Sequence, residues 1–313
     1  MKRNILVLAG GTGSVKLVRG LSKIPGLDLT VISNVGDNIW LHGLYVCPDI
    51  DTVMYGLASM LDTERGWGIK SDTFSWLESM KALGMPSWFA LGDKDLATHV
   101  TRTELLQKGH TLTSVTDFMR RKLSIKASII PATEDDVPTL IHTPDKTMHL
   151  QEFWVKYRGK PTVRSVEFKG VSDAKPSDNA IDAIESAHTI VVAPGNPVSS
   201  IGPIVAIRQL RSALQKRRAD VIGVSPFVGS SPFSGPAAKY MRASGLDPSP
   251  PGVAKYYSDF AGTIAISSKD RSLAPQIKEM DVEPVLADIY MSNSAKEKQL
   301  ALTLLRARGQ VAT

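Results

Sequence analysis

Short and nearly continuous apolar runs recur along this chain, separated by glycine-rich or proline-rich turns and by segments with helical periodicity. The first run, residues 4–9, is typical of a strand that is buried on both faces of a parallel sheet. The turn Gly10-Gly11-Thr12-Gly13 interrupts it, and residues 14–23 then carry apolar side chains at helical spacing. A second strand is predicted over residues 29–33. This strand, turn, helix and strand are the opening of a doubly wound sheet.

The rest of the pattern consists of a helical middle and a strand-rich end. Later buried strands are predicted over residues 189–193, 221–224 and 263–267, with a helix over residues 203–218. Helices in the middle are predicted over residues 51–61, 73–83, 95–108 and 113–123. Short strands are predicted over residues 128–130, 139–142 and 153–157. We therefore expect an α/β fold with residues 1–313 in a single domain. It would have a Rossmann-like parallel-sheet core, a mostly helical insertion at about residues 55–125 and a small β element at about residues 126–170.

The composition is that of an ordinary globular protein, with 313 residues of which 42% are hydrophobic and 22% are charged. These values exclude a disordered chain, and no segment approaches the ~20 apolar residues of a membrane helix. The apolar stretch after Arg3 is too short for a signal peptide, and Cys47 is the only cysteine, so we expect a cytoplasmic enzyme. The formal net charge of +6 favours anionic ligands but is too small to indicate nucleic acid.

The turn Gly10-Gly11-Thr12-Gly13 lies between a predicted strand and a predicted helix, where backbone N–H groups and the helix dipole favour a phosphate. It lacks the dinucleotide fingerprint, because Lys16 stands where the third glycine would be and Asn34 follows the second strand in place of an acidic residue. It also lacks the Gly-Lys-Ser/Thr of a Walker loop. A tight turn without a ligand is the alternative, but Thr12 and Lys16 would add contacts to an anion.

Three carboxylates follow the second predicted strand, at the edge where ligands of such sheets bind. They are Asp37, Asp49 and Asp51. Together they could hold a hard cation such as Mg²⁺, which needs only one or two carboxylates in addition to substrate phosphates. Asp51 could equally cap the helix that is predicted to begin there, and both interpretations stay open.

Two further segments carry candidate chemistry. If a helix begins at Asp95, then Asp95, His99 and Arg102 share one face. They would form an exposed ion-pair network, or they would grip a phosphate or orient a hydroxyl nucleophile. The loop at residues 194–203 joins a buried strand to a helix N-terminus, and its prolines and serines favour a preformed site over a simple turn. Trp67 is expected in the core.

Taken in order along nearly the whole chain, these motifs resemble the 2-phospho-L-lactate transferase family, which makes the deazaflavin coenzyme F420. The matching segments are residues 10–13, 16–17, 34–37, 48–55, 66–68, 91–99, 102, 195–201 and 234–239. The resemblance implies that the terminal ribityl hydroxyl of the deazaflavin Fo attacks a GDP-activated three-carbon acid, lactyl or enolpyruvoyl, and that GMP leaves. It also implies Mg²⁺ as the cofactor and a homodimer. The sequence leaves the identity of the acid open.

The resemblance also implies residue roles. The expected catalytic residues are Asp37, Asp49, Asp51 and His99, and the expected metal ligands are Asp37 and Asp51. The expected ligand-binding residues are Gly10, Gly11, Thr12, Gly13, Lys16, Asn34, Ala90, Gly92, Asp93, Arg102, Asn196, Pro197, Val198, Ser199 and Ser200. Among these, the turn around Ala90 would line the deazaflavin pocket, and the loop after Asn196 would hold the guanosine nucleotide with the glycine turn. Many family members have an acid where this chain has Asn38, so no second metal ligand is expected there.

Two rival interpretations come from other classes. One is a non-catalytic regulator of carbon metabolism that binds a nucleotide sugar, and it resembles the chain in the glycine turn and in residues 34–37. Residues 91–102 and 234–239 are more similar to the transferases. The other is a nicotinamide dehydrogenase, against which Lys16 and Asn34 argue. We expect small-molecule substrates and neither a nucleic acid nor a membrane as a partner.

Overall fold

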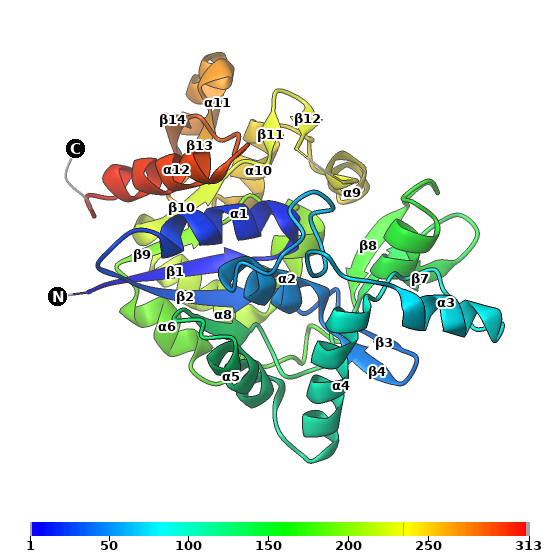
Figure 1. Cartoon of the computed structure of the whole chain (residues 1–313). Coiled ribbons are helices and arrows are strands. Elements are labelled where there is room, and N and C mark those ends of the chain that lie inside the picture. The colour runs from blue at the N-terminus through cyan, green and yellow to red at the C-terminus, as the bar shows by residue number, and fades with distance from the viewer. Residues whose placement is uncertain (1, 234, 311–313) are drawn as a thin grey trace.

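Seven parallel strands form the central sheet (Figure 1). The computed structural model describes residues 2–233 and 235–310. From edge to edge the strands are β14 (Glu283–Ala287), β13 (Thr263–Ser267), β10 (Val221–Val224), β9 (Thr189–Val192), β1 (Arg3–Ala9), β2 (Leu27–Ser33) and β5 (Ser128–Pro131). The chain builds outward from β1 to β2 and β5, returns to β9 on the other side of β1, and builds outward again. This is the Rossmann order, so the predicted α/β fold with a parallel-sheet core is confirmed.

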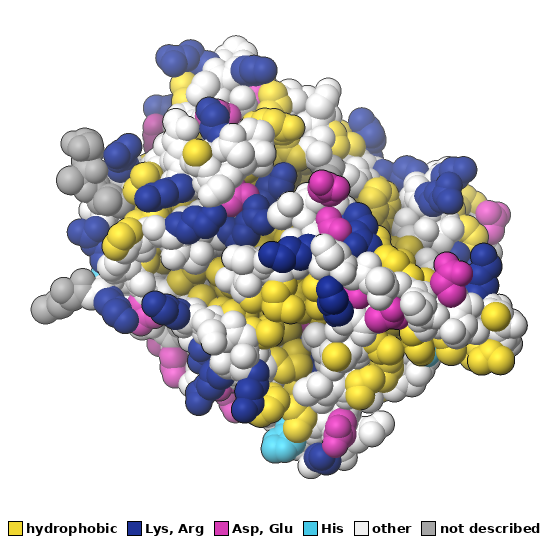
Figure 2. Space-filling model, viewed as in Figure 1, with side chains coloured by type: hydrophobic (Ala, Val, Ile, Leu, Met, Phe, Trp, Pro, Cys, Tyr) yellow, Lys and Arg dark blue, Asp and Glu magenta, His cyan; other side chains and the backbone are white. Residues whose placement is uncertain are grey.

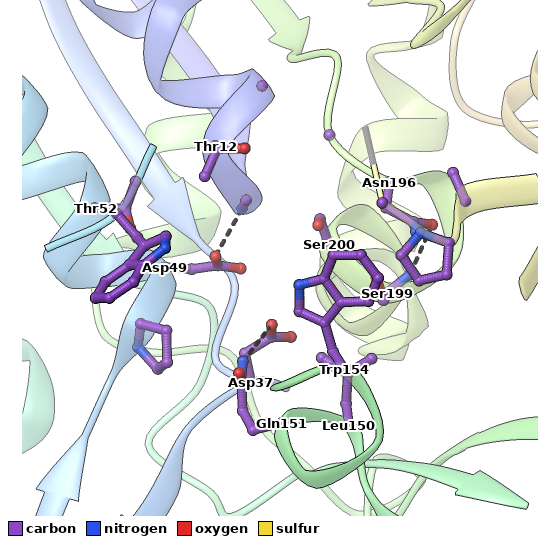
Figure 3. Close-up of a pocket in the computed structure, with 18 of the residues that line it drawn as sticks. Thr12, Asp37, Asp49, Thr52, Leu150, Gln151, Trp154, Asn196, Ser199 and Ser200 are labelled. Carbon is purple, nitrogen blue, oxygen red and sulfur yellow. Dashed lines mark hydrogen bonds between the residues drawn. The ribbon is translucent and has the colours of Figure 1, made fainter. Parts of the chain in front are cut away.

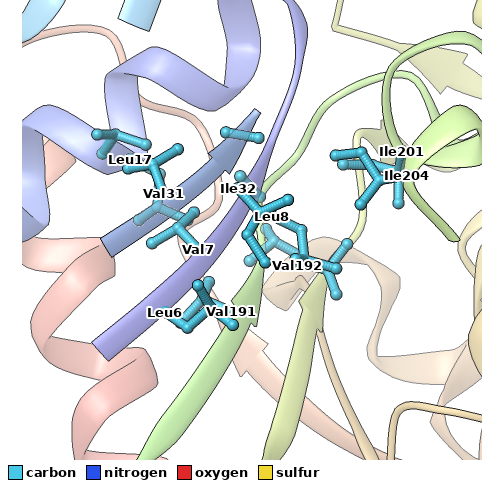
Figure 4. Close-up of a cluster of buried hydrophobic side chains, with 14 of the residues drawn as sticks. Leu6, Val7, Leu8, Leu17, Val31, Ile32, Val191, Val192, Ile201 and Ile204 are labelled. Atoms are coloured by element: carbon cyan, nitrogen blue, oxygen red, sulfur yellow. The ribbon is translucent and has the colours of Figure 1, made fainter. Parts of the chain in front are cut away.

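The sheet is buried on both faces, as its apolar strands predict. The register places Val7, Val31 and Val191 side by side, and all three are fully buried. Figure 4 shows Leu17 of α1 (Gly11–Ser22) next to Val31 and Val7. The following residue of each strand points to the opposite face, where it is also buried. Continuous apolar runs are therefore required here, because side chains of both parities face the core.

Helices cover the sheet on its two faces (Figure 1). Besides α1 they are α2 (Pro48–Leu57), α5 (Leu112–Lys122), α6 (Ala180–Ser186), α7 (Gly202–Ala206), α8 (Arg208–Lys216), α10 (Pro250–Tyr257), α11 (Ala274–Lys278) and α12 (Ser294–Ala307). The helix predicted over residues 203–218 is divided into α7 and α8, because Ile207 between them has an extended backbone (φ −69°, ψ 111°). The sequence pattern does not predict β14 or α12.

The predicted helical stretch forms part of the connection between β2 and β5. A hairpin of β3 (Ile39–Leu41) and β4 (Leu44–Val46) precedes α2. While α2 and α5 pack against the sheet, α3 (Ser75–Ala82) and α4 (Asp93–Gln107) project from it (Figure 1). Hydrophobic side chains reach the surface there, at the lower right of Figure 2, and Leu83 after α3 is 78% exposed.

A small antiparallel sheet lies beside the central one (Figure 1). Its strands are β7 (Thr147–His149), β6 (Thr139–His142) and β8 (Ser165–Phe168), in that order. The strand predicted over residues 153–157 is wrong, because the chain forms a π-helical turn at Glu152–Lys156. A half-buried strand would bury alternate residues, but only Phe153 is buried in this turn, and the side chains of Glu152 and Lys156 pair at helical spacing, 3.2 Å apart.

Shorter elements complete the fold. They are the ribbon of β11 (Phe227–Val228) and β12 (Ser231–Pro232), helix α9 (Ala237–Ala243), the π-helical turn Pro197–Ile201, and the 3₁₀ turns Arg218–Asp220 and Ser268–Leu273. Within the described part of the chain, no helix combines the length and the apolar character needed to cross a lipid bilayer.

Candidate active site

A cavity of about 550 Å³ opens at the carboxyl edge of the central sheet, beyond the ends of β1 and β9. The strand order reverses between these two strands, and ligands of open α/β sheets bind at such reversals. The floor comes from the glycine turn, the start of α2 and the loop after β9. The walls come from segments 65–67, 89–90, 150–155, 226–233 and 235–240. Figure 3 shows side chains from these distant segments converging on one space.

Glycine is required where the loops of the floor touch. A Cβ added to Gly10 would lie 2.7 Å from the Ser200 carbonyl oxygen and 2.8 Å from the Asp49 carboxylate. A Cβ on Gly13 would lie 2.5 Å from the Pro194 carbonyl oxygen. Both approaches are closer than any side chain allows. The glycine turn and the loop after β9 therefore pack backbone to backbone, with Gly10 behind the surface of the cavity and Gly11, Thr12 and Gly13 on it.

Two carboxylates face the cavity and share one amide. The Asn34 side-chain nitrogen Nδ2 lies 3.0 Å from Asp37 Oδ1 and 2.8 Å from Asp49 Oδ2. It also lies 3.2 Å from the Ser199 carbonyl oxygen, although an amide has only two N–H groups to donate to these three acceptors. Asp49 accepts a further hydrogen bond from the Gly11 N–H at 2.7 Å, and Asp37 accepts one from Gln151 Nε2 at 3.0 Å. The carboxylates of Asp37 and Asp49 therefore have fewer hydrogen-bond donors around them than they can accept.

The surroundings of Asp37 and Asp49 favour the binding of a cation. Burial raises the pKa of Asp49 to about 6, against the lowering effect of its hydrogen bonds from Asn34 and Gly11. Burial, followed by the charge of Asp49, raises the pKa of Asp37 well above its usual value. Two adjacent carboxylates that lack donors fit a divalent cation, since Mg²⁺ binds to one or two carboxylates and completes its shell with phosphates and water. Among the described residues, no group of three or more His, Cys, Asp and Glu side chains is placed to hold a metal.

Asp51 does not join this pair, contrary to the expected set of three carboxylates. Its carboxylate binds both terminal nitrogens of Arg102, whose side chain is fully buried, and it does not line the cavity. His99 lies in the same buried cluster, with Nε2 3.2 Å from the Asp95 carboxylate, which also accepts from the Tyr55 hydroxyl at 2.5 Å. The acid, imidazole and guanidinium thus share one face as predicted, but that face joins α4 to α2 away from the cavity. Neither His99 nor Arg102 is placed to contact a ligand there.

The loop after β9 is shaped by its own asparagine. The side-chain oxygen of Asn196 accepts hydrogen bonds from the N–H groups of Val198 at 3.0 Å and Ser199 at 3.3 Å, which fixes the start of the π-helical turn. Asn196, Ser199 and Ser200 line the cavity, whereas Pro197 and Val198 are buried behind it. Polar groups of this loop and of the glycine turn therefore meet, as the sequence predicts.

The residues expected to bind a ligand at the start of α4 have different roles in the structure. Ala90 lines the cavity, but Gly92 and Asp93 do not. Asp93 accepts hydrogen bonds from the N–H groups of Ser75 at 3.1 Å and Trp76 at 2.9 Å, so it caps α3. A Cβ on Gly92 would collide with Asp72, which caps α4 in the same way. Lys16 is likewise outside the cavity, because it lies on the exposed side of α1.

Aromatic side chains form the walls, and sequence reasoning missed them. Trp67, expected in the core, is 39% exposed and lines the cavity, as does Trp154, which is 43% exposed. Trp67 stands between Gly66 and Gly68, both with left-handed backbone (φ 81° and 70°), so this turn projects from the fold. The two glycines were a usable signal for Trp67. No comparable sequence signal marks Trp154, because it reaches the cavity from a π-helical turn far along the chain.

The family segment at residues 234–239 also contributes to the walls. Gly235, Pro236 and Ala237 line the cavity, and Ser234 lies outside the described residues. Together with the floor, these walls enclose a site that combines polar and aromatic surfaces. The fold and the cavity define an enzyme of the Rossmann-like α/β class.

Comparison with known proteins narrows this class. The family described as 2-phospho-L-lactate transferase CofD matches residues 5–305. The chain is 39% identical to the 2-phospho-L-lactate transferase of Methanosarcina mazei over 97% of this chain and 100% of the relative. It is 37% identical to the phosphoenolpyruvate transferase of Nocardia farcinica over 91% of this chain and 90% of the relative. The crystal structure of protein BH3568 from Bacillus halodurans covers 97% of this chain and 100% of its own, with a TM-score of 0.64 and 15% identity, and supports the fold alone. The chain therefore belongs to the 2-phospho-L-lactate transferase family and is a transferase.

Proposed function

We propose that this transferase moves a phospholactyl or phosphoenolpyruvoyl group from a GDP-activated three-carbon acid to the terminal ribityl hydroxyl of the deazaflavin Fo. The products are F420-0, or its dehydro form, and GMP. The observation that carries the proposal is one cavity with two kinds of surface. Its polar floor suits the phosphates of the donor, and its exposed indole rings suit a flat acceptor. Relatives named for either acid leave the donor open between lactyl and enolpyruvoyl.

The reaction exchanges one phosphorus–oxygen bond for another. The ribityl oxygen forms a bond to the phosphorus that carries the acid. The bond from that phosphorus to the oxygen of the GMP phosphate breaks, its electron pair stays on GMP, and the hydroxyl proton passes to solvent. Such a transfer requires alignment and neutralisation of phosphate charge more than a nucleophile from the protein. The cavity offers surfaces for both tasks.

The floor residues have separate roles in this proposal. The first N–H groups of a helix have no partner within the helix, and in α1 the Gly11 N–H already donates to Asp49. The N–H groups of Thr12 and Gly13 are then the ones that bind a donor phosphate. Asp37 and Asp49 would hold Mg²⁺, which supplies positive charge to the phosphates when it is bound. Gln151, at the start of the π-helical turn that follows β7, donates to Asp37 and holds its carboxylate in place.

The test is a fluorescence titration of the purified protein with Fo, with and without GDP and Mg²⁺, followed by measurement of GMP release with each activated acid. We expect saturable Fo binding that strengthens when the nucleotide is present, and Fo-dependent GMP release that a metal chelator suppresses. Full turnover in chelator would remove Mg²⁺ from the proposal. Binding of a uridine nucleotide sugar, with neither Fo binding nor GMP release, would favour the regulator instead.

A further inference from the structure

The cavity has an uneven charge balance. Its lining residues include two carboxylates, Asp37 and Asp49, but among the described lining residues the only Lys or Arg is Arg65. A GDP-activated acid carries negative charge on both phosphates and on its carboxylate. If the proposed function holds, the donor therefore meets a floor that repels it unless cations offset the charge. Bound Mg²⁺ would offset the carboxylates, and Arg65 is the cation that the chain itself supplies.

Arg65 lies on a turn that packs against the glycine turn. The turn is closed by a bridge between Leu61 and Ile69 and by the Gly66 N–H, which donates to the Asp62 carbonyl oxygen at 2.9 Å. A Cβ added to Gly66 would lie 3.5 Å from Cγ2 of Thr12, in the first turn of α1. The turn that carries Arg65 thus lies beside the helix N-terminus that the proposed function assigns to phosphate, and Arg65 lines the same cavity.

The guanidinium is also held in a fixed orientation. Its Nε donates to the Asp62 carboxylate at 2.7 Å, and its carbon Cζ lies 5.2 Å from the ring centroids of both Trp67 and Phe74. Hydrogen bonds from the backbone and side chain of Arg65 keep the pKa of Asp62 below its usual value, so this anchor stays ionised. Nη2 reaches the Ile69 carbonyl oxygen at 3.5 Å, and Nη1 has no partner among the described residues. A planar donor held in this way loses little entropy when it binds an anion.

We infer that Arg65 donates to a phosphate oxygen of the GDP-activated donor and is a catalytic residue of the transfer. Negative charge grows on the GMP phosphate as the phosphorus–oxygen bond breaks. A preorganised guanidinium therefore stabilises the transition state more than it stabilises the bound donor. The contact therefore contributes to the rate as well as to donor affinity. Trp67 and Phe74 act through Arg65 by covering the guanidinium.

The test compares Arg65→Ala with Arg120→Ala. Arg120 is a matched control on α5, outside the cavity, because its Nε donates to Asp117 at 2.7 Å and its Nη1 to the Ile125 carbonyl oxygen at 3.2 Å. We expect R65A to lower kcat/KM for the donor by about 100-fold to 1,000-fold, with a loss in kcat as well as a rise in KM. Fo affinity should fall much less than donor affinity, because Arg65 reaches Fo only through the ring of Trp67. Added guanidinium ion should restore part of kcat in R65A and have no such effect on R120A.

The outcomes separate this inference from the proposed function. If the wild type releases GMP with Fo, and R65A has the kcat/KM of R120A, the inference about Arg65 is wrong and the proposed function stands. If the wild type neither binds Fo nor releases GMP, the proposed function fails first. Arg65→Lys keeps the charge and the aliphatic stem, so it tests the same point should R65A not fold. It is expected to keep more of kcat than Arg65→Gln, and equal losses in these two would overturn the role of charge.

Discussion

Replacing Asp51 by Asn should destabilise the fold rather than remove a group from the reaction. The two terminal nitrogens of Arg102 bind the Asp51 carboxylate, and the two side chains are 0% and 5% exposed. Burial is the largest influence on the pKa of Arg102 and lowers it, but the charge and hydrogen bond of Asp51, with smaller contributions from Cys47 and Tyr55, together raise the pKa overall. Because an Arg side chain does not lose its proton in proteins, the guanidinium stays charged when Asp51 is replaced. The substitution therefore leaves a buried cation without its counter-ion.

The magnitude follows from what remains around that cation. After the change, Nη1 still has the Tyr45 carbonyl oxygen at 3.2 Å and lies 3.3 Å from His99 Nδ1, but neither carries a full negative charge. Removing one partner of a buried pair costs about 3–5 kcal/mol, because the other charge stays desolvated. Asn retains one hydrogen bond to Arg102, so we expect about 3 kcal/mol. Replacing both partners by apolar residues, as in Asp51→Leu with Arg102→Met, should recover most of this loss.

The assay is urea unfolding followed by far-UV circular dichroism and tryptophan fluorescence, together with GMP release below the unfolding transition. Asp37→Asn is the matched control, because Asp37 lines the cavity and its raised pKa means that its charge does not stabilise the fold. We expect this control to unfold no more easily than the wild type and to lose turnover. If Asp51→Asn instead unfolds like the wild type and loses all turnover, its carboxylate acts on a ligand, as the family resemblance implies, and the structural reasoning is refuted.

Three further predictions concern the cavity. A Cβ at position 13 would lie 2.5 Å from the Pro194 carbonyl oxygen, so Gly13→Ala should cost about 1–3 kcal/mol and weaken GDP binding; an unchanged thermal melt would contradict this packing. The pKa of Asp49 is about 6 in the folded protein, above the unfolded value, so its contribution to stability is lost as pH rises through 6. Asp49→Asn should therefore raise the urea midpoint at pH 7 more than at pH 5, and equal midpoint shifts at about these pH values would refute the assignment. Lys239 donates to the carbonyl oxygens of Gly159, Lys160 and Pro161 at 2.6, 3.2 and 3.0 Å, behind Trp154. Lys239→Met should therefore weaken Fo binding in a fluorescence titration and leave GDP binding unchanged, whereas equal losses for both ligands would count against it.

The sheet and the floor of the cavity were predictable because both follow from local patterns. Buried parallel strands require apolar runs such as the one that ends at Ala9, and loops that follow such strands meet at one edge of the sheet. The walls were not predictable in this way. Gln151 reaches Asp37 across 114 positions of the chain, and Trp154 enters the same cavity from the same turn. Contacts of this range depend on how the small sheet packs against the large one, and no local periodicity encodes that arrangement.

Asp49 and Asp51 lie on different sides of α2, although the sequence predicted that both would face one ligand. The helix was expected to begin at Asp51, but Pro48 occupies its first position, so both aspartates lie in its first turn. Residues two apart on a helix point about 200° away from each other and cannot face one ligand. The neighbours of each aspartate on the helix lie on the same side as that aspartate. Thr52, three positions after Asp49, lines the cavity. Tyr55, four positions after Asp51, hydrogen-bonds to Asp95 in the buried cluster. One face of this short motif therefore lines the cavity, and the other face joins α2 to α4. Substitution of Asp49 should mainly affect ligand binding and turnover, whereas substitution of Asp51 should mainly affect stability.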